Sequence, residues 1–147
     1  MASDRLPGWI AQTMHDYLES RLAAGETRAV AEDNAARSAE ENFPGGAPKL
    51  GHHIFDIQSD GLVVGYLWLA PSAADPDSWW VFDIEILEQY RRQGHARAAL
   101  ELGHAVAAEH GATSIGLNVF GYNSGAHDLY RSLGYEVTAM QMQRQLP

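Results

Sequence analysis

The spacing of apolar residues divides the chain into a helical first part and a mixed second part. Ile10, Met14 and Leu18 recur at helical spacing near the N-terminus. Beyond residue 50 the period changes to two, as in "HHIFDIQ" and "LVVGYLWLA", which is typical of strands. The pattern predicts helices over 8–24, 27–42, 94–110 and 123–133, and strands over 52–58, 62–70, 79–87, 112–120 and 135–143.

The order of these predicted elements indicates an α+β fold. Strands 52–58 and 62–70 flank the turn "SDG" and are typical of an antiparallel hairpin. Helices separate the later strands, so a mixed sheet flanked by helices follows. A length of 147 residues suits one domain, 1–147, whose N-terminal part, 1–49, is helical.

Composition excludes several functional classes. The absence of cysteine excludes disulfides, thiolate metal sites and cysteine nucleophiles. A formal net charge of −9 opposes binding to nucleic acid and favours a cationic substrate. The longest apolar run, 62–70, is about half of a membrane-spanning helix. We expect a cytoplasmic protein that binds no nucleic acid or membrane, and we predict no metal site because the seven histidines have no matched partners.

A cluster of positive charge surrounds one glycine where a predicted strand runs into a predicted helix. Arg91, Arg92 and Arg97 flank Gly94 in a chain that is acidic overall. The start of a helix repels cations but attracts anions through its free N–H groups and its dipole. The sequence therefore predicts a phosphate site at this turn, although the arginines could also be a solvated helix start.

Two motifs in the second half carry a family resemblance. The run from Arg91 to Ala96, "RRQGHA", fits Q/R-x-x-G-x-G/A, and "NSGAHDLY" (123–130) followed by "GY" (134–135) fits N-x-x-A-x-x-L-Y-x-x-x-G-F/Y. In this order and spacing they are more specific than either alone. Over about 50–143 the chain resembles the GNAT superfamily of acyl-CoA-dependent N-acetyltransferases.

The resemblance implies a mostly antiparallel central sheet in which strand 79–87 splays from strand 112–120 to hold acyl-CoA. Acetyl-CoA would be the acyl donor, and the acceptor would be a small-molecule amine or a protein amino group. The main chain of Ile84, Glu85 and Ile86 would contact the cofactor, and Asn123 would contact it from the second motif. The pyrophosphate would lie against the first motif and the residue after it, which are Arg91, Arg92, Gln93, Gly94, His95, Ala96 and Arg97.

Two residues are candidates for proton transfer. By its place in the second motif, Tyr130 would protonate the departing thiolate. Glu85 would accept the amine proton or attract the ammonium form. Each has an alternative: Tyr130 as a core aromatic and Glu85 as a solvated strand residue. Asn123 could likewise be a helix N-cap.

Alternation along strand 79–87 predicts which side chains share a face. Asp83 and Glu85 would lie on one face, and Phe82, Ile84 and Ile86 on the other. We expect four aromatic side chains to be core residues: Tyr66, Trp68, Trp79 and Trp80. The alternative is that they line a substrate pocket.

We therefore predict an N-acetyltransferase that moves an acetyl group from acetyl-CoA to a primary amine by direct attack in a ternary complex. An alternative is a non-catalytic acyl-CoA-binding sensor or regulatory module, and another is a protein-interaction module that uses the acidic N-terminal helices. The exposed edge strands of such a sheet favour a homodimer.

Overall fold

The structure is a computed structural model that describes residues 1–147. The observed order of elements follows the predicted one as far as residue 132. No helix combines the length and the apolar character that crossing a membrane requires. The elements are α1 (Leu6–Ala23), α2 (Arg28–Asn42), η1 (Pro44–Gly46), β1 (His53–Ser59), β2 (Leu62–Pro71), β3 (Ser78–Ile86), η2 (Glu88–Tyr90), α3 (His95–Glu109), β4 (Ser114–Leu117) and α4 (Ser124–Ser132).

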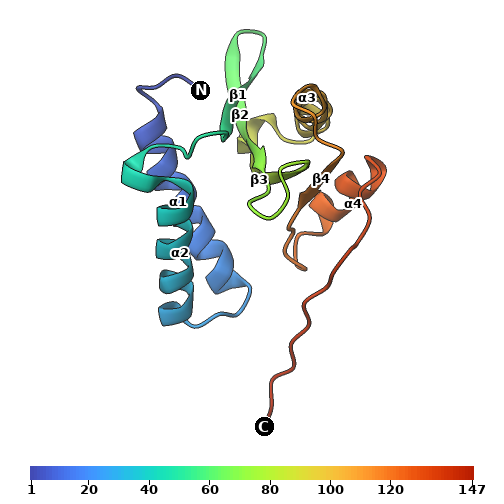
Figure 1. The fold of residues 1–147 in the computed structure, drawn as a ribbon. Coiled ribbons are helices and arrows are strands. Elements are labelled where there is room, and N and C mark those ends of the chain that lie inside the picture. Colours follow the sequence, from blue (N-terminus) through green and yellow to red (C-terminus); the bar gives the residue numbers. More distant parts are fainter.

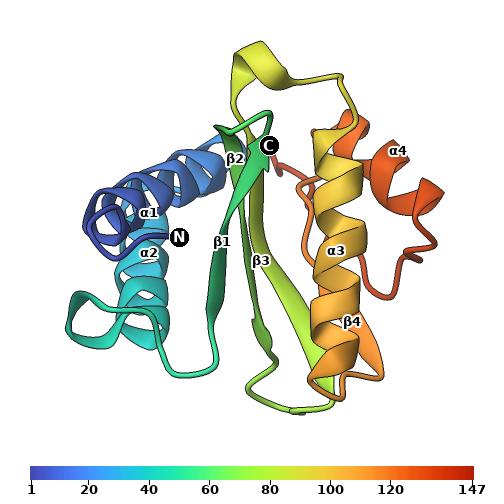
Figure 2. The same cartoon turned by 90° about the horizontal axis from the view of Figure 1, so that it is seen from above.

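The four strands form one sheet in the order β1-β2-β3-β4. The first two pairs are antiparallel, and β3 pairs with β4 in parallel. Helices α1 and α2 lie on one side of the sheet, and α3 and α4 lie on the other (Figures 1 and 2). The predicted mixed α+β architecture, with a mostly antiparallel sheet flanked by helices, is confirmed.

A hydrophobic core lies between α3 and the sheet. Small residues on one face of α3 allow the helix to approach β2 closely. A Cβ atom at Gly103 would lie 2.9 Å from Cδ2 of Leu67 and 3.1 Å from Cδ1 of Leu69. Both distances are shorter than an ordinary van der Waals contact, so a larger residue there would force the leucine side chains to move. The core residues are Leu67, Leu69, Trp79, Val81, Leu100 and Ala107.

A second, aromatic core lies on the α1/α2 side of the sheet. Trp9 of α1 packs edge-on against Trp68 of β2 and against Phe43, which follows α2. Ile54 of β1 completes the cluster. Trp68 and Trp79 are 3% and 2% exposed, so the prediction that they are core residues is confirmed.

Strand β3 contains a β-bulge at Phe82. Leu69 pairs with Val81 and Trp68 pairs with Asp83, so Phe82 has no partner on β2. Its ring stacks on Trp68, with centroids 4.7 Å apart, on the α1/α2 face. The prediction that Phe82 shares a face with Ile84 and Ile86 is therefore wrong, because the extra residue breaks the alternation.

The last predicted strand does not form. Residues 135–143 have no regular secondary structure, and the chain from there to the C-terminus leads away from the body of the protein (Figure 1). The prediction is wrong because a strand needs a neighbour, and an alternating pattern does not supply one. The preceding strand is also shorter than its predicted range, 112–120.

Candidate functional site

Strands β3 and β4 are paired only at one end. The pairing runs from Ser78 with Ser114 to Val81 with Leu117. Beyond that point β3 continues to Ile86 along β2, whereas β4 has ended. The second half of β3 therefore has a free edge towards the missing part of β4, and the predicted splay of these strands is present.

The main-chain groups of β3 point alternately towards β2 and towards this free edge. The N–H of Leu87 donates to the carbonyl of Val64, 2.9 Å away. In an antiparallel pair every second residue bonds to the partner strand, so the main chain of Glu85 faces β2. The main chain of Ile84 and Ile86 then faces the free edge, where a ligand can bond to Ile84 and to the N–H of Ile86, since the Ile86 carbonyl already accepts a hydrogen bond from Arg91.

The turn between β3 and α3 exposes backbone donors. Arg92 and Gly94 both have left-handed backbones, with φ of 62° and 84°. Gly94 is the N-cap of α3, and no side chain caps the helix or places an acid in its first turn. The first intrahelical bond is from the N–H of Ala98 to the carbonyl of Gly94, so the preceding N–H groups are free to bind an anion.

The three arginines of the turn differ in their partners. The Nε of Arg91 donates to the carbonyl of Ile86 at 2.8 Å, and its Nη2 lies 3.6 Å from Oε1 of Glu85. Arg97 donates to the hydroxyl of Ser132 on α4 at 2.5 Å. Arg92 has no hydrogen bond or ion pair and is exposed. Of the three guanidinium groups, it is the one free to meet a phosphate.

Helix α4 carries the second motif. The Oδ1 atom of Asn123 accepts a hydrogen bond from the N–H of Ala126 at 3.3 Å, so Asn123 is an N-cap. Tyr130 is half-buried against the α3-side core, and its ring centroid lies 5.7 Å from that of Tyr135. Burial, and secondly the charge of Asp83, raises the pKa of the Tyr130 phenol. The phenol therefore keeps its proton at neutral pH.

A half-buried carboxylate that the sequence did not single out as a proton acceptor lies on the face of β3 towards α1. The hydroxyl of Tyr66 donates to Oδ2 of Asp83 at 2.8 Å. Burial raises the pKa of Asp83 to about 6, and the charges of Glu85 and Asp16 add to the rise. The bulge at Phe82 turns the Asp83 side chain towards α1. No sequence signal predicts a bulge at Phe82.

Glu85 lies on the same face as Asp83, as predicted. It pairs opposite Tyr66 on β2. Its side chain is 37% exposed and lies near the Arg91 guanidinium. Glu85 therefore contributes negative charge at the open end of the face, whereas Asp83 is the more enclosed carboxylate.

Helix α1 covers this acidic face. The Trp9 ring lies 5.3 Å from the Tyr66 ring. Thr13, one turn later, is buried, and its hydroxyl has no hydrogen-bond partner. Asp16 follows on the same helix and contributes to the raised pKa of Asp83. The α1 side chains and the second half of β3 together form a polar, negatively charged environment.

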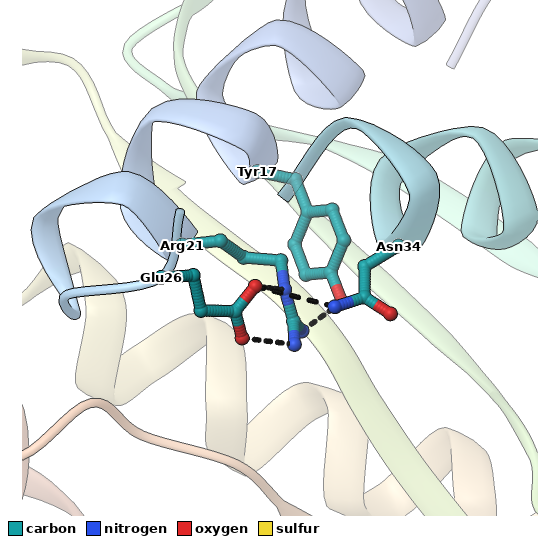
Figure 3. A network of polar contacts seen from close by, with 4 residues as sticks. All are labelled: Tyr17, Arg21, Glu26 and Asn34. Carbon is teal, nitrogen blue, oxygen red and sulfur yellow. Dashed lines mark hydrogen bonds and ion pairs between the residues drawn. The ribbon is translucent and has the colours of Figure 1, made fainter. Parts of the chain in front are cut away.

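A polar network fixes the turn between α1 and α2. Arg21 bonds to Glu26 through two nitrogens and to the hydroxyl of Tyr17 at 2.6 Å. Asn34 of α2 donates to Glu26 at 3.2 Å. Figure 3 shows the four side chains converging from α1, from α2 and from the turn between them. The network holds the two helices as a unit on this side of the sheet.

A cavity of about 500 Å³ opens on the same side of the sheet. Phe82, which directly precedes Asp83, lines it together with His52, Lys49 and Glu41. His52 accepts a hydrogen bond from the Trp68 indole at 3.0 Å, and burial lowers its pKa. The cavity thus combines an aromatic wall with one cation and one carboxylate.

Comparisons with known proteins agree with this geometry. The uncharacterized N-acetyltransferases YdgE and YycN of Bacillus subtilis are each 26% identical to the chain, over 99% of it and over 95% and 96% of their own lengths. The crystal structure of YycN superposes with a TM-score of 0.87 at 24% identity, covering 100% of this chain and 96% of that one.

A more distant structure shares the fold. The aminoglycoside N-acetyltransferase AAC(6')-Iy, in complex with a CoA bisubstrate analog, has a TM-score of 0.61 at 15% identity, covering 100% of this chain and 95% of that one. The model of the acetyltransferase (GNAT) family matches residues 11–135, which is most of the chain. The chain therefore belongs to the acetyltransferase (GNAT) family.

Proposed function

We propose that the protein is an N-acetyltransferase that moves an acetyl group from acetyl-CoA to a primary amine. The observation that carries this proposal is the open half of β3, which ends at an uncapped helix start. A strand edge with free main-chain groups and an anion site at its end suit a long acyl chain that ends in phosphates.

The residues of the turn fit the cofactor. The N–H groups at the start of α3 and the guanidinium of Arg92 would hold the pyrophosphate. The main chain of Ile84 and Ile86 would hold the pantetheine along the strand edge, and the cap residue Asn123 stands at the start of the facing helix. When bound, acetyl-CoA supplies an acetyl group as a reactive thioester.

The face of β3 towards α1 would receive the acceptor. Asp83, Glu85 and Asp16 give it negative charge, which attracts an ammonium group. The similarity to AAC(6')-Iy, whose structure contains an acetylated neamine analog, supports an amine acceptor. The acceptor and the cofactor would thus approach the reacting atoms from opposite sides of the sheet.

Three protons must move during the reaction, two away from the nitrogen and one onto the sulfur. We infer that Asp83, rather than the expected Glu85, takes the proton of the ammonium group, because it is the more enclosed carboxylate of this face and its burial raises its pKa. The amine nitrogen would then form a bond to the thioester carbon, the carbon–sulfur bond would break, and the nitrogen would release a second proton to water. The Tyr130 phenol would give its proton to the leaving thiolate and take one back from water.

The cofactor half of the proposal is tested by calorimetric titration with acetyl-CoA. Arg92→Glu is expected to weaken binding by about 10- to 100-fold, because a charge-assisted hydrogen bond becomes a repulsion. Arg28→Glu on α2 is the matched control, since it changes the net charge by the same amount at a position far from the turn. A wild-type protein that does not bind acetyl-CoA would refute the transferase assignment.

The catalytic half is tested by thiol release with a panel of primary amines. Tyr130→Phe is expected to lower kcat by about 100-fold or more while leaving acetyl-CoA affinity unchanged. Tight acetyl-CoA binding with no thiol release in the presence of any amine would favour the non-catalytic sensor over the enzyme.

A further inference from the structure

The cavity on the α1/α2 side of the sheet contains a cation that the proposed chemistry does not use. Lys49, in the loop between α2 and β1, lines the cavity and is the one lysine of the chain. Glu41 also lines the cavity but forms no ion pair with Lys49, and no other carboxylate does. An unpaired lysine on a surface is common, but here two further donors lie at the same cavity.

A tight turn brings Lys49 and His52 together. The N–H of His52 donates to the carbonyl of Lys49 at 3.0 Å, and the N–H of Lys49 donates to the carbonyl of Asn42 at 2.8 Å. Gly51, the third residue of the turn, has a φ of 87°, a conformation that glycine adopts at little cost. Burial, and secondly the charge of Lys49, lowers the pKa of His52, so the two side chains are close neighbours. The backbone of the loop therefore fixes where both side chains begin.

His52 and Ser72 add neutral donors to this cation. The Trp68 indole donates to Nδ1 of His52 at 3.0 Å, so the neutral ring carries its proton on Nε2. The Ser72 hydroxyl accepts a hydrogen bond from the N–H of Ala74 at 3.3 Å and keeps its own proton to donate. Both residues line the cavity. An ammonium group, an imidazole N–H and a hydroxyl together suit a carboxylate ligand.

An aromatic surface connects this positive end to the proposed base. The Phe82 ring lines the cavity, is 36% exposed, and lies 5.2 Å from the His52 ring. Asp83 is the next residue, and the bulge puts its side chain on the same face. This side of the sheet thus has negative charge at Asp83 and Glu85, positive charge at Lys49, and an apolar surface between them.

We propose that the acceptor is an amino carboxylate, a primary amine that carries a carboxylate group beyond an apolar spacer. This inference rests on the proposed N-acetyltransferase function and names its substrate class. The amine would lie at Asp83, the spacer on the Phe82 ring, and the carboxylate at Lys49 with His52 and Ser72. Lys49 is then a residue that determines specificity without touching the reacting atoms.

The kinetic test compares amino carboxylates with amines that lack the carboxylate. Thiol release is measured with glycine, 4-aminobutyrate and 6-aminohexanoate, and with methylamine, propylamine and pentylamine as their matched alkylamines. We expect kcat/KM to be higher for the best amino carboxylate than for its alkylamine. Lys49→Gln should lower this ratio by about 10-fold, because a charge-assisted hydrogen bond is lost. Arg28→Gln, which removes the same charge at the far end of α2 from Glu41, is the matched control and should leave the ratio unchanged.

The outcomes separate this inference from the proposed function. Thiol release that shows no preference for the carboxylate, or a preference that Lys49→Gln leaves intact, would overturn the inference and retain the N-acetyltransferase. No thiol release with any amine would refute the proposed function, and the acceptor role with it.

A nuclear magnetic resonance titration tests the carboxylate site without the reaction. Adding 6-aminohexanoate to the chain alone should shift the amide resonance of Gly51 and the ring resonances of His52. Lys49→Gln should weaken the binding by about 10-fold, again because the charge-assisted hydrogen bond is lost. Pentylamine should leave these resonances in place. A wild-type chain whose Gly51 and His52 resonances do not respond would overturn the site, whatever the activity.

Discussion

The two halves of strand β3 differ in what their edges do. From Ser78 to Val81 the strand is paired on both sides, with β2 and with β4. From Phe82 to Ile86 it is paired only with β2, and it carries the bulge and two carboxylates. One continuous strand thus provides a closed half that holds the sheet together and an open half whose edge is free for the proposed acyl-CoA.

The difference shows how a stable sheet can include a site that is costly to fold. Asp83 in the open half is half-buried, and its raised pKa means that the folded protein resists its ionisation. The closed half and the two cores supply the stability that offsets this cost. Substitutions in the open half should therefore change activity and pH dependence, and substitutions in the closed half should change stability.

The largest effect is expected from Asp83→Asn. We expect kcat with an amine to fall by about 100-fold, because an amide cannot accept the ammonium proton. In the wild type, the rate should rise with pH through about 6 as Asp83 loses its proton, and this step should be absent in the variant. A wild-type rate profile retained in Asp83→Asn would assign the base elsewhere, with Glu85 the next candidate.

The same substitution should stabilise the protein. Because the pKa of Asp83 is raised on folding, its contribution to stability is full below about pH 4 and is lost as pH rises through about 6. Above pH 6 the variant should be about 2 kcal/mol more stable than the wild type, and below pH 4 the two should agree. Urea unfolding across this range measures the difference, with the exposed Asp4→Asn as control.

Gly116→Ala tests the closed half. A Cβ atom there would lie 2.3 Å from Cζ3 and 2.7 Å from Cε3 of Trp80, so the indole ring would have to move. We expect a loss of about 2 kcal/mol in the free energy of unfolding. Gly8→Ala in α1, where no atom lies within 4 Å of the new Cβ, is the control and should not destabilise. Equal stability of both variants would show that the closed half tolerates repacking.

Tyr66→Phe is expected to have a smaller effect on the open half. The hydroxyl that it removes donates to the Asp83 carboxylate and lowers the pKa of that group. The rate profile should therefore shift to higher pH, and stability near pH 7 should fall by about 1 kcal/mol. A profile that stays in place would mean that Asp83 is not the group whose titration the rate follows.

Asn123→Ala should give the smallest change. Its bond to the N–H of Ala126 is exposed and 3.3 Å long, so removal of the cap should cost about 0.5–1 kcal/mol. Asn123→Ser should restore most of this stability. If Asn123 also contacts the cofactor, acetyl-CoA affinity will fall in both variants. Because Asn123→Ser keeps the cap, a loss of affinity in that variant would report the contact with the cofactor and not the cap.

Much of the fold follows from local patterns in the sequence. The hairpin of β1 and β2 was predictable because "SDG" separates two alternating segments, and α3 because its small and apolar residues recur at helical spacing. The glycine turn was predictable because Gly94 stands between a strand and a helix. Its left-handed backbone is one that glycine adopts at little cost.

Features that depend on distant partners were not predictable. The bulge at Phe82 is visible only in the register of β3 against β2, and it decides that Asp83 and Phe82 share a face. The partners of Arg91 and Arg97 lie on other elements, so their spacing in the sequence gave no sign of them. The segment after Tyr135 has a strand-like pattern but no neighbour in its own chain.

The bulge separates two kinds of deletion in β3. Removing Phe82 itself would restore regular alternation and leave Asp83 and Glu85 facing α1, because Val81 faces α3 and the next residue of a regular strand faces the other way. The loss would be the contact of the Phe82 ring with Trp68. A codon deletion at Ile84, in the regular part of the strand, would instead turn Glu85 into the core beneath α3, so the two deletions should differ sharply in their cost.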